Sequence, residues 1–220
     1  MGQWREEKKI VLEAAQKMLG KGLVVGTAGN VSLRLPIEGE RQLLAITPSA
    51  QHYYLLGVDD IQIVDFNGQT IEGSLPSSME TMLHIGIYRA RKNVNAVIHT
   101  HSVFASAVSV AGRDIPPILD DQVAFLGGGI ELARHALSGS REQVVNVVAA
   151  LGDRNAVLLP NHGAIGTGRT MRDAFTACEL IEKTARIYLL ALSAGTVNHL
   201  PAEAIEAEKA LYDRLQYESE

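Results

Sequence analysis

Two apolar, β-rich runs that each lead into histidine constrain the fold of this chain more than any other feature. Residues 94–101 read VNAVIHTH, and residues 156–163 read AVLLPNHG. Branched aliphatic residues favour strands that are buried within a sheet, so we interpret both runs as buried strands. Helices must then cover a sheet whose strands end in polar residues, which predicts a mixed α/β domain.

The remaining periodicity predicts further strands and a set of amphipathic helices. Strands are expected at residues 43–47 and 61–65, with FNGQ as a hairpin turn before TIEG, and after the turn in GTAGNVSLR. Helices are expected at residues 4–21, 77–91, 103–111, 130–151 with a break at SGS (138–140), 170–194 and 202–217. No repeat, low-complexity tract or linker interrupts this pattern, so residues 1–220 are interpreted as a single domain.

Composition excludes several classes of protein. The net charge of −5 argues against a general nucleic-acid binder, which would carry a basic patch. No apolar run reaches the roughly 18 residues of a membrane span, and the charged N-terminal segment does not resemble a signal peptide. The single cysteine, Cys178, cannot form an internal disulfide, so a cytoplasmic protein with an inert core thiol is expected.

The histidines at the strand ends predict a metal site. His99 and His101 are two apart on a strand, so their side chains point to the same side, roughly 6–7 Å apart at Cα. His162 follows the second run, and two neighbouring strands would bring all three rings to one sheet edge. Three protein ligands and an open position are typical of catalytic zinc. The alternative is three ordinary, hydrogen-bonded histidines.

Glu80 has more than one interpretation on sequence alone. It follows Ser77 by three residues, the spacing of a capping box at the start of the helix predicted at 77–91. His84, one turn later, shares its face of the helix and could compete as a metal ligand or orient a neighbour. Spacing leaves these alternatives open.

Three short polar turns are candidates for an anion cradle. They lie at residues 26–30, 47–50 and 76–78, and each combines small residues with side chains that can donate hydrogen bonds. Ser77 and Ser78 also stand at a predicted helix N-terminus, where free amides favour an anion. Each turn alone is better explained as an ordinary turn or a helix cap, but together they suggest a phosphate pocket.

The ordered set of motifs resembles a known family. GTAGNVS, ITPS, PSSMETMLHIGIYRAR, NAVIHTHS, IPPI and LLPNHG occur in the order and spacing of the class II aldolase/adducin-head family, most like its fuculose phosphate aldolase branch. The resemblance runs from about residue 6 to 192, and the tail at about 196–220 matches poorly. It implies a three-layer α/β/α domain with a central, largely antiparallel sheet, assembled as a homotetramer with sites at subunit interfaces.

The resemblance also implies roles for individual residues. The family's metal, usually Zn²⁺ with Mn²⁺ or Co²⁺ as alternatives, would be held by His99, His101 and His162. Glu80 would be the acid/base carboxylate and would also ligate the metal before substrate binds. The phosphate contacts would be Gly29, Asn30, Ser49, Ser77 and Ser78.

The implied reaction is cleavage of a ketose 1-phosphate to dihydroxyacetone phosphate and an aldehyde through a metal-bound enediolate. Glu80 would transfer the proton, with a pKa raised by burial. The family also dehydrates methylthioribulose 1-phosphate, epimerises pentulose 5-phosphates at carbon 4 and decarboxylates 3-oxo-tetronate 4-phosphates. A scaffold role like that of adducin heads is the alternative outside enzymes, and loss of the metal ligands would be expected there.

Two departures concern the anion turns. The family's turn usually reads TPSG, whereas Ala50 stands here in place of the glycine, which matters if the turn needs a positive φ. The segment also holds one extra residue between the serines and the glutamate, which leaves the register of Ser77 and Ser78 open by one position.

Two further departures concern catalysis. After the IPPI run, Asp120 and Asp121 stand where the fuculose branch has a tyrosine that reaches across the subunit interface. Asp120 or Asp121 could take its proton-transfer role, and a surface turn is an equal alternative. The family's C-terminal tyrosine would be Tyr217 or Tyr212. The aldehyde half of the substrate, its stereochemistry and the native metal are not fixed by the sequence.

Overall fold

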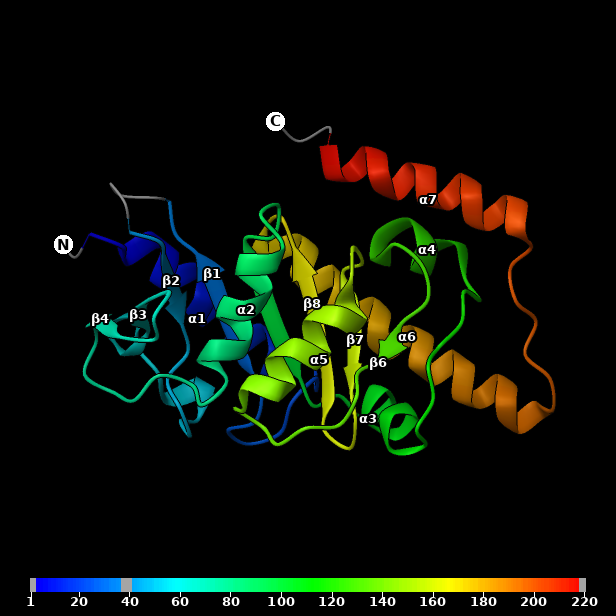
Figure 1. Ribbon diagram of the computed structural model, residues 1–220. Coiled ribbons are helices and arrows are strands. Elements are labelled where there is room, and N and C mark those ends of the chain that lie inside the picture. Colours follow the sequence, from blue (N-terminus) through cyan, green and yellow to red (C-terminus); the bar gives the residue numbers. More distant parts are fainter. Residues whose placement is uncertain (1–2, 37–40, 218–220) are drawn as a thin grey trace.

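The computed structural model describes residues 3–36 and 41–217, with the side chain of Tyr217 outside the described part. One eight-stranded sheet runs through the centre in the order β4-β3-β2-β1-β5-β8-β7-β6 (Figure 1). Only β6 and β7 are parallel, and every other neighbouring pair is antiparallel. The strands are β1 (Asn30–Arg34), β2 (Leu43–Ile46), β3 (Gln62–Asp65), β4 (Thr70–Glu72), β5 (Ala96–Thr100), β6 (Glu131–Leu132), β7 (Ala156–Leu159) and β8 (Gly163–Gly168).

Helices cover both faces of the sheet, which confirms the predicted three-layer α/β fold. The α-helices are α1 (Arg5–Gly20), α2 (Thr81–Ala90), α3 (Val103–Val110), α4 (Asp120–Leu126), α5 (Arg141–Leu151), α6 (Met171–Ala194) and α7 (Ala202–Tyr217). Helices α2 and α5 pack on the face that is nearer in Figure 1, and α1, α3 and α6 pack on the other. Helix α7 lies along α4, so the two predicted C-terminal helices are both present.

Strand β5 shows why its sequence is apolar throughout. Val97 packs into the core beneath α2 and α5, whereas Ala96 and Ile98 pack into the core beneath α1 and α6. Successive side chains of a strand point to opposite faces, and both faces are covered here. The predicted buried strand is therefore confirmed.

Two predicted helices begin later than expected. Residues 77–80 do not belong to α2, because Ser77 pairs with Pro48 in an isolated bridge and the chain turns before Thr81. The helix predicted at residues 130–151 was wrong in its first part. Glu131–Leu132 form β6 beside β7, and the helix begins only at Arg141, where the Ser140 hydroxyl accepts from the Gln143 amide. Strand pairing outweighed the local helical periodicity there.

Cys178 lies in the core on α6, as predicted for an inert thiol. It is fully buried, and burial raises the pKa of its thiol to about 12. None of the helices in the described part of the chain combines the length and the apolar character needed to cross a bilayer.

Candidate metal centre and substrate cavity

The structure brings His99, His101 and His162 together. Nε2 of His99 lies 2.8 Å from Nε2 of His101 and 3.3 Å from Nε2 of His162. One ligand atom from each residue can be chosen so that all three lie within 4.8 Å of one another. His99 is fully buried, and the other two rings are half-buried at the edge of a cavity.

These three nitrogens fit a divalent ion. Nitrogens bound tetrahedrally at about 2.0–2.1 Å from zinc lie roughly 3.3 Å apart, close to the observed separations. The Nδ1–H of His99 is 3.0 Å from the Ala164 carbonyl, which leaves Nε2 with its lone pair free. Burial and the neighbouring rings lower the pKa of His101 to about 4 and also lower that of His162. Uncharged imidazoles are the form that binds metal.

Strand order explains how distant histidines meet. The two histidine-bearing runs were expected on neighbouring strands, and this detail was wrong because β8 lies between β5 and β7. Strand β8 is antiparallel to both, so β5 and β7 run in the same direction and their C-terminal ends lie at the same end of the sheet. His162 occupies the turn from β7 to β8 at that end. Gly163 permits the approach, since a Cβ there would lie 2.0 Å from the Thr100 carbonyl oxygen.

Glu80 lies beside the histidines and does not form the predicted capping box. It is itself the N-cap of α2 and makes no side-chain cap hydrogen bond. Its Oε2 accepts from Asn30 Nδ2 at 2.9 Å and lies 3.3 Å from His99 Nε2. Asn30 and His99 are paired across β1 and β5, which brings both to this carboxylate.

The pKa of Glu80 differs from the expectation of a raised value. Burial alone would raise it, but the electrostatic interaction with the neighbouring His99 ring and the hydrogen bond from Asn30 outweigh burial and hold the pKa at about 2. Glu80 is therefore a carboxylate at neutral pH. It can face a cation directly, and it can accept a proton only when its surroundings change.

His84 is buried behind this centre and is not part of the histidine cluster. Its Nδ1 is 2.7 Å from the Ser32 hydroxyl, which is also 2.7 Å from the Tyr88 hydroxyl. Burial lowers the pKa of His84 to about 3, so the ring is uncharged. The sequence left two roles for His84, a metal ligand or a residue that orients a neighbour. Its hydrogen bond to Ser32 fits the second role better.

A cavity of about 200 Å³ opens in front of the metal centre. His101, His162 and Glu80 line one part of it. All three predicted anion turns reach this cavity, which is also lined by Thr27, Ala28, Gly29, Asn30, Pro48, Ser49, Ala50, Ser78, Met79 and Ser138. A ligand bound at the metal would thus lie beside backbone amides and hydroxyl groups.

The family is decided by comparison with known proteins. Residues 9–189 match the sequence profile described as the class II aldolase and adducin N-terminal domain. The chain belongs to this family. Class II aldolases are lyases that use a divalent metal, and a sugar phosphate substrate fits the family.

Individual members of the family resemble nearly the whole chain. The 5-deoxy-D-ribulose 1-phosphate aldolase of Bacillus thuringiensis serovar kurstaki is 34% identical over 92% of this chain and 93% of its own. The 5-methylthioribulose-1-phosphate/5-deoxyribulose-1-phosphate aldolase of Rhodospirillum rubrum is 36% identical over 89% and 86%. A solved L-fuculose 1-phosphate aldolase has a TM-score of 0.88 at 31% identity, covering 94% and 96%. The predicted relation to the fuculose branch of this family is confirmed.

The two serines of the family motif occupy different places. Ser78 is buried and lines the cavity, and its hydroxyl accepts from the Glu80 amide at 3.2 Å. Ser77 pairs with Pro48 and is not among the residues that line the cavity. The one-residue shift suspected from the sequence therefore favours Ser78 as the serine that meets a ligand.

The acidic pair that replaces the family's tyrosine lies elsewhere in the subunit. Asp120 is the first residue of α4 and is exposed, and Asp121 forms an ion pair with Lys183 of α6. Neither carboxylate lines the cavity in front of the histidines.

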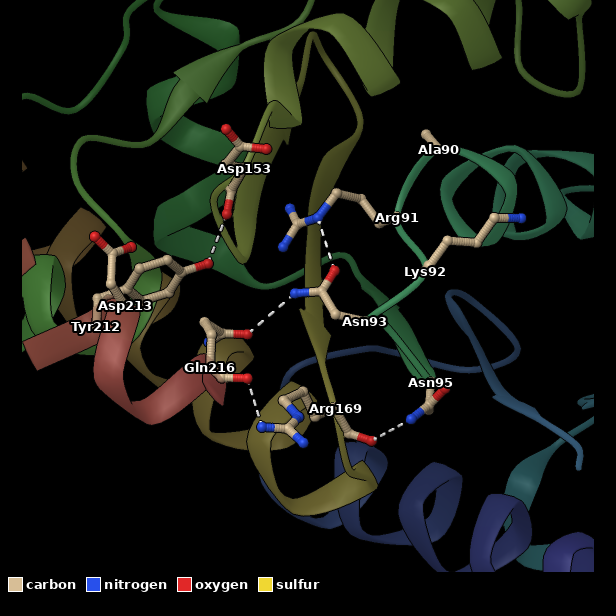
Figure 2. A pocket seen from close by; sticks show the side chains of 10 residues that line it. All are labelled: Ala90, Arg91, Lys92, Asn93, Asn95, Asp153, Arg169, Tyr212, Asp213 and Gln216. Atoms are coloured by element: carbon tan, nitrogen blue, oxygen red, sulfur yellow. Dashed lines mark hydrogen bonds between the residues drawn. The ribbon is translucent and has the colours of Figure 1, made fainter. Parts of the chain in front are cut away.

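Tyr212 supports the C-terminal helix rather than this metal centre. It lines a second cavity, of about 690 Å³, beside the start of β5 and the end of β8 (Figure 2). Its hydroxyl donates to the Asp153 carbonyl at 2.6 Å, and its ring packs against Gly127. Arg91 beside it donates to the carbonyls of Gly152 and Arg154. Tyr217 ends α7, and its side chain lies outside the described part.

Sequence reasoning missed three residues that support the site. Tyr53 donates to the Ala28 carbonyl and so holds the turn before Gly29. Ser138 and Gln143 both donate to Glu80 Oε1, at 3.1 and 3.3 Å. Their segments are far from Glu80 in the sequence, so local spacing carried no signal for these contacts.

Proposed function

We propose that this chain is a zinc-dependent aldolase that cleaves a ketose 1-phosphate to dihydroxyacetone phosphate and an aldehyde. The observation that carries the proposal is the convergence of three histidine nitrogens and a carboxylate on one cavity. The three polar turns that were candidates for anion binding border the same cavity. A divalent ion held by His99, His101 and His162 would act as a Lewis acid toward charge that develops on substrate oxygens.

The chain's own residues would divide the remaining work. Gly29, Asn30, Ser49 and Ser78 border the cavity and would bind the phosphate, which fixes the position of the carbon chain. Breaking the C3–C4 bond would leave its electron pair on C3, while the C4 hydroxyl gives up a proton and becomes the aldehyde. The Glu80 carboxylate would take up a proton and deliver it to C3, so that the proton lost at C4 is balanced by the one gained in dihydroxyacetone phosphate.

We infer a substrate with an apolar far end. The relatives' names specify 5-deoxyribulose, 5-methylthioribulose and fuculose phosphates, all of which end in a methyl or thioether group. Met79 lines the cavity and is 79% exposed, so it offers an apolar surface for such a group. With 5-deoxyribulose 1-phosphate the products would be dihydroxyacetone phosphate and acetaldehyde.

A substrate panel tests this reaction. Zinc-loaded protein is incubated with the three ketose 1-phosphates, and dihydroxyacetone phosphate is followed with a coupled NADH assay. Release from at least one substrate is expected, with kcat at least about 100-fold lower in Glu80→Gln. Ser49→Ala should mainly raise KM. If substrate disappears without dihydroxyacetone phosphate, the aldolase assignment fails and dehydration, epimerisation or decarboxylation is indicated.

Metal analysis tests the centre itself. Purified protein should hold one zinc ion per chain, and His162→Ala should lose it together with turnover. Full metal occupancy in His162→Ala would remove this histidine from the ligand set. Protein that binds no divalent ion at all would favour a scaffold.

We further propose a cytoplasmic homotetramer in which Asp120 or Tyr217 acts in a neighbouring subunit's site. The exposed position of Asp120 outside its own cavity is compatible with this role. Light scattering should give the mass of four chains. Mixed oligomers of inactive Glu80→Gln and Asp120→Asn should recover partial activity, and absence of any recovery would argue against shared sites.

A further inference from the structure

The two oxygens of the Glu80 carboxylate contact different groups, the histidine cluster on one side and neutral hydrogen-bond donors on the other. Oε2 faces the metal-binding nitrogens and receives one hydrogen bond, from Asn30. Oε1 receives the Ser138 hydroxyl at 3.1 Å and the Gln143 side-chain amide at 3.3 Å. With both oxygens engaged, the rotation of the carboxylate about its last bond is fixed.

Gln143 is oriented so that only its amide nitrogen can reach Glu80. Its side-chain oxygen accepts from the Gly139 backbone amide at 2.7 Å, which directs Nε2 toward Oε1. Its own backbone amide donates to the Ser140 hydroxyl at the start of α5. Gln143 is buried, so this contact is not open to solvent.

The loop before α5 places the second donor. Ser138 lies in an exposed stretch, yet it reaches across to line the cavity. Gly139 has a φ of +77°, and a Cβ there would lie 3.3 Å from the Met79 carbonyl oxygen. A left-handed glycine therefore lets the loop approach the residue that precedes Glu80.

We propose that Gln143 and Ser138 are positioning residues that hold Glu80 Oε1 so that Oε2 faces the metal. The inference rests on the proposed role of Glu80 beside a metal. Gln143 acts only through Glu80, because it is buried away from the cavity. Ser138 lines the cavity, so it would also be accessible to a bound substrate. Neutral donors that fix a ligating carboxylate tune metal affinity and activity, by about 10- to 100-fold when removed.

Metal affinity gives a test that needs no substrate. The variants are Gln143→Met, which keeps the volume and removes the donor, and Asn146→Ala, a control on α5 that donates to the Arg134 carbonyl at 3.3 Å. Zinc dissociation constants are measured by chelator competition in folded protein. Gln143→Met should bind zinc about 10-fold more weakly, and Asn146→Ala should match the wild type.

A double-mutant cycle separates positioning from general damage. In a Glu80→Gln background, Gln143→Met should cause little further loss of zinc affinity, because its effect passes through Glu80. Equal losses in both backgrounds, or none in either, would overturn the proposal. In turnover, Gln143→Met should lower kcat with little change in KM, whereas Ser138→Ala should also raise KM.

The outcomes also distinguish this proposal from the proposed function. Absence of dihydroxyacetone phosphate with every substrate, combined with a zinc affinity that depends on Gln143 only through Glu80, would reject the aldolase reaction and retain the positioning role. Normal aldolase turnover in Gln143→Met with unchanged zinc affinity would reject the positioning role and retain the aldolase reaction.

Discussion

Ala50 adopts a left-handed backbone conformation in the turn that borders the cavity. Its φ is +54°, and among the described residues only Asn161 is another non-glycine residue with a positive φ. A side chain in this region costs roughly 1–2 kcal/mol because its Cβ crowds the following carbonyl. The glycine that the family usually has at this position adopts a positive φ without this cost. Alanine adopts it here at a cost in stability.

Replacing this residue should relieve the cost. Ala50→Gly is expected to raise the free energy of unfolding by about 0.5–1 kcal/mol, after allowance for the greater freedom of glycine in the unfolded chain. Thermal or urea unfolding measures the change. Ala28→Gly is the matched control in the neighbouring turn, where φ is not positive, and it should destabilise the protein. Ala50→Gly with lower stability than wild type would contradict this account.

Ser32 connects two buried polar side chains beneath the metal centre. Its hydroxyl is 2.7 Å from both His84 Nδ1 and the Tyr88 hydroxyl, and all three residues are fully buried. Ser32→Ala should destabilise the protein by about 1–3 kcal/mol, because two buried partners lose a hydrogen bond. Ser193→Ala, at an exposed position of α6, should change stability by less than about 0.5 kcal/mol. Equal melting temperatures for the two variants would contradict the expectation.

Strand β8 is the element that assembles the metal centre. It pairs with β5 on one side and β7 on the other, and it begins directly after His162. Glycine at position 163 lets the turn that carries His162 approach Thr100, at the end of β5. The geometry of the three nitrogens thus depends on backbone contact as well as on the histidines themselves.

Gly163→Ala should therefore weaken metal binding beyond its effect on stability. Its Cβ would lie 2.0 Å from the Thr100 carbonyl oxygen, so the turn must move away from β5. Gly168→Ala, at the other end of β8, is the control. Its Cβ would also clash, at 2.4 Å from the Ala174 amide nitrogen, but this clash is far from the histidines. Zinc affinity measured well below both melting temperatures should fall only in Gly163→Ala. Equal affinities in the two variants would contradict this role of Gly163.

Several buried titratable groups make the whole molecule sensitive to acid. The pKa of His84 is lowered from 6.5 to about 3 by burial, and that of Glu80 is held at about 2. The unfolded chain takes up protons on such groups at higher pH than the folded chain. Stability therefore falls as pH decreases, from about 6.5 for His84 and from about 4.5 for Glu80.

Metal-free protein should accordingly lose stability below pH 6.5. Each such group contributes a slope of about 1 kcal/mol per pH unit, so the melting temperature should fall steadily between pH 6.5 and 4. His84→Gln removes one of these groups and should give a shallower slope, whatever its effect on stability at pH 7. Parallel slopes for the two proteins would show that His84 does not titrate in this way.

The sequence determined the sheet core, the outer helices and the identity of the three histidines that could hold a metal ion. A continuous apolar run indicates a strand that is buried on both faces of a sheet, so residues 94–101 carried this information locally. The HTH spacing fixed two rings on one side of β5, and the motifs identified the family. Helical periodicity failed at residues 130–138, where Glu131–Leu132 pair with β7 and the helix begins only at Arg141.

Only the tertiary structure decided what surrounds Glu80. Its sequence spacing suggested a capping box, but Asn30, Ser138 and Gln143 reach it from 50 to 63 residues away. The order of β5, β8 and β7 was likewise unreadable from local patterns. Contacts between distant segments depend on how sheet and helices pack together, and spacing along one strand or helix does not encode that packing.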